Sequence, residues 1–476
     1  MDAQVAAPAP DESTRPGRVR ALWNWLKSAA RSDRAALKDL GPAEVGELRE
    51  IFRDCLAETG GEASARGRVQ WLATTYQGLT DPSRTRFLQV LADEFGPDEQ
   101  AVTRAIQDYL HTPPGPERRN VESRLRLALG SPRIRILKQF NLLPDGVKFL
   151  VDLRTDVLRF AGDAPELEVV DEELYSLLGS WFDVGNLELT RISWASPAVL
   201  LEKLIAYEAV HEIRGWGDLR NRLDSDRRCY AFFHPRMPGE PLIFVEIALT
   251  RDIAANVQTL LDESAPILEP RAAHAAIFYS ISNTQTGLRG VSFGGFLIKR
   301  VVEQLLAEFP KLKTFATLSP VPGFRRWLEG EIKARRPDLL AKADADRVCR
   351  VAITTDPYEA FGDLMKRDLT EDAEAAITLE PLLLNLCARY LAEAKEGEGA
   401  NVQPVDPVAR FHLGNGARLE RINWLSDTSP RGMKQSCGLM VNYLYKLDEI
   451  EDNHEAYARE AQVVMSGSVK RLLKPR

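Results

Sequence analysis

Apolar residues recur at helical spacing through the first part of the chain. Phe87, Leu91 and Phe95 follow one another at four-residue steps, which puts them on one face of a helix. Short segments rich in proline and glycine separate several stretches of this kind. The pattern predicts an all-α helical bundle over residues 19–178, without a catalytic constellation. Residues 1–18, rich in alanine, proline and charge, are expected to form a disordered tail.

The pattern changes near residue 178, and residues 179–476 predict a mixed α/β domain. Two β-rich runs within 229–250 flank a turn that contains proline and glycine, as in a β-hairpin. Further strands are expected at 274–282 and 313–320, with a helix at 293–308 between them. The sheet is therefore expected to combine hairpins with one crossover connection. Near the C-terminus, a helix is predicted to begin at Ser429–Pro430 and to bury an apolar stripe made of Leu439, Met440, Tyr443, Leu444 and Leu447.

The loop that precedes the helix at 293–308 is unusually rich in glycine, with Gly287, Gly290, Gly294 and Gly295. Glycines at such a junction either satisfy packing or let backbone amides approach an anion at the start of the helix. The spacing matches neither GxxxxGK[ST] nor GxGxxG, so neither a nucleotide P-loop nor a dinucleotide fingerprint is supported. The glycines therefore indicate either a packing requirement or a phosphate site.

Composition and charge limit the class of protein. A chain of 476 residues predicts two domains, and 44% hydrophobic with 28% charged residues is typical of a soluble globular protein. The formal net charge of -7 argues against a nucleic-acid partner. An uninterrupted apolar run of membrane-spanning length and a secretory signal are both missing from the sequence, so no membrane partner is expected and a cytoplasmic location is predicted.

Metal and disulfide chemistry find little support in the sequence. The five cysteines are scattered, odd in number and without a CxxC pair, which favours reduced thiols. His211–Glu212 begins like HExxH, but no second histidine follows at the required spacing. A zinc site is therefore not expected.

Two longer blocks, 280–328 and 406–447, resemble the signature regions of the malonyl-CoA decarboxylase family, and a weaker resemblance extends through 206–249. The resemblance implies an N-terminal helical domain, a catalytic domain of the GNAT acyltransferase fold, and conversion of malonyl-CoA to acetyl-CoA and CO2. It also implies a homodimer or homotetramer, and the helical domain is expected to be the place of self-association. The chain ends in Lys-Pro-Arg, without the peroxisomal tripeptide of some animal relatives, which again favours a cytoplasmic enzyme.

Decarboxylation of a malonyl thioester itself sets requirements for the active site. Loss of CO2 from a malonyl thioester leaves a carbanion that delocalises as an enolate onto the thioester oxygen. The enzyme must supply donors for that oxygen and an acid for the carbon. Because the thioester is itself the electron sink, no metal and no organic cofactor is expected.

The resemblance also assigns roles to individual residues. It implies that Ser319 accepts a proton, that His412 donates one, and that Tyr445 contacts the ligand. From the chemistry, Ser319 is expected to orient the departing carboxylate and His412 to stabilise and protonate the enolate. The phosphates of malonyl-CoA are expected on the loop made of Arg289, Gly290, Val291, Ser292, Phe293, Gly294 and Gly295. Animal members carry an acidic residue where this chain has Ser292, so no catalytic role is assigned there.

The residues alone leave other interpretations open. A serine before proline is usually a turn residue, a histidine beside an Asn-Gly turn is usually structural, and Tyr445 fits an apolar helix stripe equally well. Ser319 lacks a GxSxG elbow, so no covalent acyl-enzyme is expected. An acyl-CoA-dependent acyltransferase and a non-catalytic acyl-CoA sensor both remain alternatives. Release of free CO2 separates the decarboxylase from either one.

Overall fold

The computed structural model describes residues 39–57, 61–291, 297–397 and 402–474. The predicted tail, 1–18, lies outside these residues. The chain divides into two compact units. The first, here called the helical unit, comprises Met1–Ser180 together with the short segment Thr286–Gly290. The second, the sheet unit, comprises Trp181–Gln285 and Val291–Arg476.

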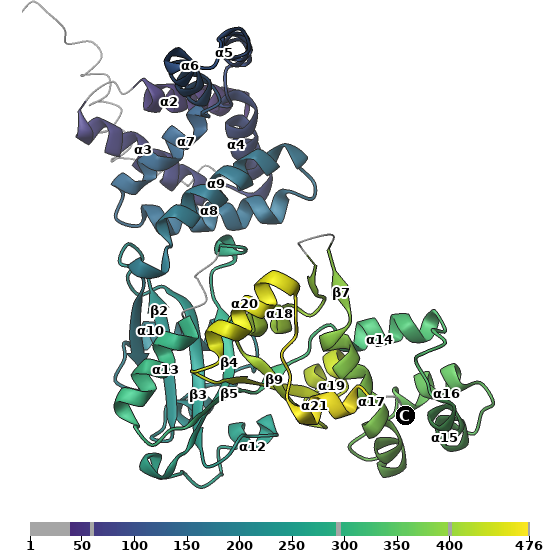
Figure 1. The fold of residues 1–476 in the computed structure, drawn as a ribbon. Helices are drawn as coiled ribbons and strands as arrows, with labels where there is room; N and C mark the ends of the chain where they lie inside the picture. Colours follow the sequence, from purple (N-terminus) through teal and green to yellow (C-terminus); the bar gives the residue numbers. More distant parts are fainter. Residues whose placement is uncertain (1–38, 58–60, 292–296, 398–401, 475–476) are drawn as a thin grey trace, which may run out of the picture. The chain divides into compact units, whose positions relative to one another are not determined.

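The helical unit is built from amphipathic helices around an aromatic core. Phe52 and Phe87 pack edge to face with ring centroids 5.3 Å apart, and Tyr76 packs on Phe87 at 5.0 Å. Asp98 caps one helix by accepting two backbone N–H bonds, which satisfies amides that the helix itself leaves free. The main helices are α2 (Pro42–Leu56), α3 (Glu62–Gly78), α4 (Asp81–Glu94), α5 (Glu99–His111), α6 (Pro116–Ala128), α7 (Pro132–Gln139), α8 (Gly146–Phe160) and α9 (Glu168–Trp181) (Figure 1).

The sheet unit contains one large mixed sheet with the order β1-β2-β3-β4-β5-β10-β6, and β9 pairs with β10. Its neighbours are antiparallel except β4 and β5, which are parallel. A helical region followed by a mixed-sheet domain is the architecture that the sequence predicts, and it is confirmed. The strands are β1 (Glu188–Ile192), β2 (Arg227–Phe233), β3 (Pro241–Thr250), β4 (Ala275–Asn283), β5 (Thr314–Thr317), β6 (Ser319–Pro320), β9 (Arg418–Asn423) and β10 (Met440–Tyr445).

The parallel pair is joined by the predicted crossover, whose helix is α13 (Leu297–Glu308) (Figure 1). The expected helix start at 293 lies outside the described residues. The parallel ladder ends at the pair Phe278 and Thr317, whereas β4 continues to pair with β3 as far as Asn283. After Thr317 the chain instead joins β10 through β6. The last part of β4 therefore has no ladder on its β5 side among the described residues.

The helix predicted after Ser429 is wrong in its extent. The helix α19 covers only Pro430–Ser436, and Cys437 ends it in the left-handed conformation with φ 53°. The chain then enters strand β10, whose six residues are all buried. A strand in the middle of a sheet buries both faces, so its unbroken apolar run matches a helical stripe as well as a strand.

The sheet unit also contains further helices. Helix α17 (Ala373–Ala392) is long and apolar enough to span a membrane by length and composition, but 56% of its most apolar stretch is buried inside the protein, as in a core helix. A two-stranded ribbon, β7 (Lys395–Glu396) with β8 (Gln403–Pro404), lies apart from the large sheet. The helices are α10 (Ala198–Tyr207), α11 (Trp216–Arg222), α12 (Val257–Leu261), α14 (Phe324–Lys333), α15 (Lys342–Ala352), α16 (Pro357–Leu364), α17 (Ala373–Ala392), α18 (Pro407–Gly414), α20 (Ile450–Glu460) and α21 (Gly467–Leu472).

Candidate active site

Ser319 and His412 meet inside the sheet unit. Ser319 begins β6, His412 lies in the last turn of α18, and the Ser319 Oγ atom is 3.1 Å from His412 Nε2. Their exposed fractions are only 6% and 3%. A buried hydroxyl and imidazole in hydrogen-bond contact form a pair able to move or hold a proton.

Backbone features bring the two segments together. Strand β10 pairs with both β5 and β6, and Val441 lies opposite Ser319 in that ladder. On the other side, the Asp406 carboxylate accepts the Ala409 N–H at 2.8 Å and fixes the start of α18. The helix ends at a turn where Gly416 has φ 78°, a conformation that favours glycine.

Two tyrosines of β10 fix the imidazole of His412. The Tyr445 hydroxyl lies 2.8 Å from His412 Nδ1, and the Tyr443 ring stacks on the imidazole with centroids 4.6 Å apart. Because side chains two apart in a strand face the same side, the strand presents both tyrosines to one imidazole. The predicted residues Ser319, His412 and Tyr445 are thus brought together, although Tyr445 was expected on a helix.

The hydrogen bonds define a consistent arrangement of protons. The Ser319 hydroxyl donates to Thr317 Oγ1 at 2.9 Å, and Thr317 Oγ1 also accepts the Tyr443 backbone N–H at 3.1 Å. With that proton committed, Ser319 Oγ accepts from Nε2–H of His412, and Nδ1 accepts the Tyr445 hydroxyl. This assignment follows from hydrogen-bond satisfaction. It leaves a single proton on the neutral ring, at the nitrogen that faces Ser319.

Burial sets the charge state of this group of residues. It lowers the pKa of His412 from 6.5 to about 3, so the imidazole is neutral near pH 7. Burial also raises the pKa of Tyr445 well above 10.0, so the phenol keeps its proton and can donate it to Nδ1. Any anion that enters will favour the protonated imidazole and oppose the effect of burial.

Thr317 and Tyr443 belong to the site but were not predicted from the sequence. A signal for Thr317 was present, because residues 317 and 319 are two apart in a predicted strand and so face the same side. Tyr443 carried no such signal, because it was assigned to the stripe of a helix. Only the strand assignment of β10 reveals its contact with His412.

A cavity of about 430 Å³ adjoins the site. Tyr445 lines it together with Gly414 and Asn415, which follow His412, and with Ile298 and Lys299 of α13. The volume lies in the range of small-molecule sites. Tyr445 therefore contacts the cavity on one side and His412 on the other. Lys299, which sequence reasoning also missed, brings a cation to the wall of this cavity.

Two glycines of the glycine-rich loop are required for different reasons. A Cβ atom at Gly287 would lie 1.8 Å from the Val151 carbonyl oxygen, so this glycine is required by packing. Gly290 has φ 82° and is required by its backbone conformation. Arg289 is exposed and Val291 is buried. The remaining predicted loop residues, Ser292, Phe293, Gly294 and Gly295, lie outside the described residues.

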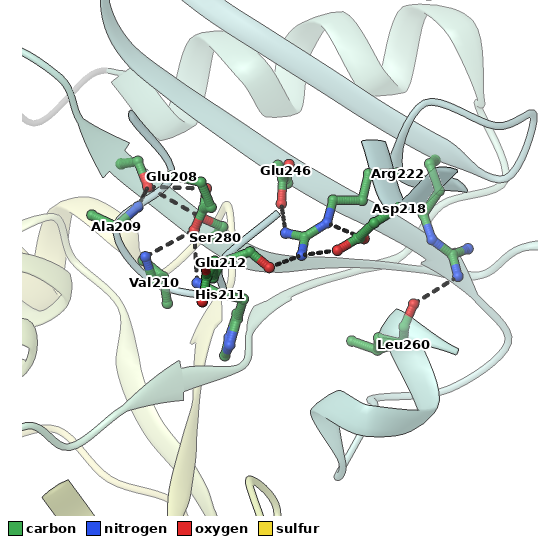
Figure 2. Close-up of polar contacts among 12 residues, drawn as sticks. Glu208, Ala209, Val210, His211, Glu212, Asp218, Arg222, Glu246, Leu260 and Ser280 are labelled. Atoms are coloured by element: carbon green, nitrogen blue, oxygen red, sulfur yellow. Dashed lines mark hydrogen bonds and ion pairs between the residues drawn. The ribbon is translucent and has the colours of Figure 1, made fainter. Parts of the chain in front are cut away.

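A second group of buried polar residues lies along β3 and β4 (Figure 2). Arg222 binds Asp218 at 2.8 Å and Glu246 at 2.9 Å, and all three are almost fully buried. Glu208 accepts the Ser280 hydroxyl at 2.8 Å and two backbone N–H groups at 2.8 Å (Figure 2). Each charged group has a partner, so we interpret the network as structural. Through Ser280 it holds the part of β4 that lies beyond the ladder with β5.

Among the described residues, no group of three or more His, Cys, Asp or Glu side chains is arranged to hold a metal ion. The five cysteines, all within the described ranges, are free thiols.

Comparisons with known proteins agree over nearly the whole chain. Residues 95–182 match the family described as malonyl-CoA decarboxylase N-terminal domain, and residues 185–476 match the malonyl-CoA decarboxylase C-terminal domain. The mitochondrial malonyl-CoA decarboxylase of Rattus norvegicus is 37% identical over 465 residues, covering 94% of this chain and 91% of the relative. The Mus musculus protein of the same name is also 37% identical, over 96% of this chain and 93% of the relative.

Solved structures give the same result. The crystal structure of malonyl-CoA decarboxylase from Rhodopseudomonas palustris is 42% identical with a TM-score of 0.81, covering 90% of this chain and 99% of that chain. The enzyme from Agrobacterium vitis has the same identity and TM-score, over 90% of this chain and 100% of that chain.

Proposed function

The chain belongs to the malonyl-CoA decarboxylase family, and we propose that it converts malonyl-CoA to acetyl-CoA and CO2 at the Ser319–His412 pair. The observation that carries the proposal is the buried contact of 3.1 Å between the serine hydroxyl and the imidazole. It joins the two residue types that the reaction needs, in a site from which bulk water is largely excluded.

The reaction begins with cleavage of the bond between the carboxylate carbon and the α-carbon. Its electron pair passes into the thioester as an enolate, CO2 leaves, and the α-carbon then takes up one proton. The proposed role of Ser319 is to hold the carboxylate out of the thioester plane, where the breaking bond overlaps the carbonyl π system. In the structure the Ser319 hydroxyl donates to Thr317, so this role requires the hydroxyl to turn its proton from Thr317 to the carboxylate when substrate binds.

His412 is proposed to stabilise the enolate and to protonate its carbon. Burial holds the pKa of His412 near 3, but the malonyl carboxylate brings a negative charge that raises this pKa. The ring can therefore gain a proton as substrate binds and give it to the carbon once CO2 has left. The contact of Tyr445 with Nδ1 keeps the ring oriented through both steps.

Substrate binding is proposed to involve three elements. The cavity lined by Tyr445 supports binding of the acyl part. The edge of β4 beyond Phe278, which carries no ladder on its β5 side among the described residues, offers backbone groups to the amides of the pantetheine arm. The loop from Arg289 to Val291, continued by Ser292, Phe293, Gly294 and Gly295, is proposed to receive the phosphates. The thioester acts as electron sink, so we expect turnover without added metal or organic cofactor.

Self-association through the helical unit remains part of the proposal. Helices α5 and α6 lie side by side and bury very few of their own residues. They leave a row of exposed apolar side chains, here called the α5–α6 face, made of Ile106, Leu110, Leu127 and Leu129. Such a face favours a homodimer or homotetramer. The named relatives are mitochondrial proteins, while a cytoplasmic location for this chain stays a prediction.

The test is release of labelled CO2 from carboxyl-labelled malonyl-CoA by purified protein without added metal, with the thioester product identified by mass. Acetyl-CoA and CO2 in equal amounts would support the proposal, provided that the His412→Ala variant forms both at least about 10²-fold more slowly. A folded protein that binds malonyl-CoA and releases no CO2 would contradict it. An acylated acceptor would then indicate a transferase, and binding without turnover a sensor.

A further inference from the structure

The segment Thr286–Gly290 follows β4 in sequence but groups with the helical unit. Arg154 of α8 makes this association. Its side chain is 3% exposed, and its Nη1 atom donates to the carbonyl oxygens of Gly287 at 2.8 Å and Arg289 at 2.9 Å. Its Nε atom binds the Asp171 carboxylate of α9 at 2.8 Å. The guanidinium is thus fixed on one side by a carboxylate and on the other by two loop carbonyls.

A second side chain of α9 extends this contact. The Tyr175 hydroxyl donates to the Gly290 carbonyl oxygen at 3.3 Å, and the Arg154 guanidinium lies 5.2 Å from the centre of the Tyr175 ring. Asp171 and Tyr175 are four residues apart and so share one face of α9. The close fit of Gly287 against Val151 completes the contact, because any side chain at 287 would separate loop from helix.

The orientation of the carbonyls determines where the amides point. In a trans peptide the C=O and the N–H point in opposite directions. Holding the carbonyls of Arg289 and Gly290 on α8 and α9 therefore turns the N–H groups of Gly290 and Val291 away from these helices. Within the described part of the chain, the Gly290 N–H has no hydrogen-bond acceptor.

The same short stretch carries an unpaired cation. The Arg289 side chain is exposed, and among the residues that the structure describes its guanidinium has no carboxylate or carbonyl partner. Gly290, with φ 82°, supplies the left-handed step at which successive amides converge on an anion. A free amide next to a free guanidinium is suited to a phosphate group.

We propose that Arg154, with Asp171 and Tyr175, is a positioning clamp of the helical unit that holds the Gly290 amide and the Arg289 guanidinium ready for the phosphates of coenzyme A. The inference rests on the proposed function for the identity of the ligand. Arg154 itself does not touch the substrate. It acts through the loop, so the helical unit takes part in substrate recognition in addition to any role in self-association.

Two substrates separate positioning from general stability: malonyl-CoA, and malonyl-pantetheine, which has the same thioester without the phosphates. We expect Arg154→Ala to raise KM for malonyl-CoA about tenfold or more, corresponding to loss of a charge-assisted contact. We expect kcat to change little, and kcat/KM for malonyl-pantetheine to stay at the wild-type value. Arg154→Lys should recover part of the lost affinity, because an ammonium can still donate to the carbonyls.

The matched control is Arg159→Ala, which removes another arginine of α8. Arg159 binds Asp81 and Asp156 instead of the loop, so both substrates should behave as with wild type. If Arg154→Ala does not fold, the same measurements are made on Tyr175→Phe. This variant should fold, because the Tyr175 ring is half exposed and the substitution removes only the hydroxyl that contacts Gly290. We expect a KM for malonyl-CoA raised about two- to fivefold in that variant.

The proposal of a clamp is contradicted if Arg154→Ala lowers kcat/KM equally for both substrates. It is also contradicted if neither Arg154→Ala nor Tyr175→Phe changes the KM for malonyl-CoA. Failure of the proposed function gives a different result, namely no CO2 from either substrate with wild-type protein. In that case the dissociation constants of coenzyme A and pantetheine still test the clamp. A loss of affinity for coenzyme A alone in Arg154→Ala would support it.

Discussion

The Nε2 atom of His412 lies 3.1 Å from the Ser319 hydroxyl oxygen, although 93 residues separate the two in sequence. The contact depends on β10, which pairs with the serine segment and also supplies the two tyrosines that contact the histidine. The geometry of the pair is therefore a property of the sheet register.

Replacing His412 by alanine tests its chemical role. We expect kcat to fall by about 10² to 10⁴, because a general acid acts only in the chemical step. Affinity for coenzyme A should remain near the wild-type value. His274→Ala, which removes an exposed histidine outside the site, is the control and should keep full activity. Unchanged turnover in His412→Ala would remove the residue from the mechanism.

Tyr445→Phe tests the orientation of the imidazole. Loss of the hydroxyl leaves Nδ1 of a buried ring without a donor, at a cost of about 1–3 kcal/mol. We expect kcat/KM to fall about 10- to 100-fold. Tyr457→Phe is a matched control, because the Tyr457 hydroxyl is buried and has no hydrogen-bond partner among the described residues, so its removal should be neutral or stabilising. Equal activity of the two variants would contradict the orienting role.

Stability should depend on pH through His412. Its pKa is about 3 in the folded protein and near 6.5 when unfolded, so below pH 6.5 the unfolded chain binds a proton that the folded one does not. The free energy of unfolding should therefore decrease as pH falls, with a slope approaching about 1.4 kcal/mol per pH unit between the two values. Urea unfolding at pH 7 and pH 5 should show a loss about 2 kcal/mol larger in wild type than in His412→Gln. Parallel losses in the two proteins would mean that His412 is accessible to water.

Two glycine substitutions should have different effects. Gly287→Ala puts a Cβ against the Val151 carbonyl and should lower the free energy of unfolding by about 3 kcal/mol. Gly290→Val meets open space apart from the Tyr175 ring at 3.5 Å, so its stability cost, about 1–2 kcal/mol, comes from φ 82°. In addition it should raise KM for malonyl-CoA, because it crowds the amides beside Arg289. A Gly290→Val variant with unchanged KM would make the loop a packing feature only.

The α5–α6 face should support self-association. The double variant Leu110→Glu with Leu127→Glu introduces charge where the side chains are 70% and 76% exposed, so the folded protomer should tolerate it. Light scattering after size exclusion should show a smaller assembly than wild type. Ile377→Glu, at a 72% exposed position of α17, is the control and should not change the mass. If all three proteins have the same mass, the face does not hold the assembly together.

Local pattern was sufficient for much of the fold. The hairpin of β2 and β3 and the crossover from β4 through α13 to β5 follow from alternation, turn residues and helical spacing. Strands β1 and β9 were not predicted, and β10 was assigned to a helix, because six consecutive buried residues match a helix as well as a central strand. Local pattern cannot separate the two, because burial on both faces removes the alternation that identifies a strand.

The sequence by itself determined the family, the helical first part, the mixed-sheet second part, and Ser319 and His412 as candidates. Only the tertiary structure decided their distance, the contacts of Thr317, Tyr443 and Tyr445, and the neutral state of the histidine. Hydrogen bonds and burial at this site arise from segments far apart in the chain. The same reason applies to Arg154, because its proposed role depends on hydrogen bonds to two carbonyl oxygens more than a hundred residues away in the sequence.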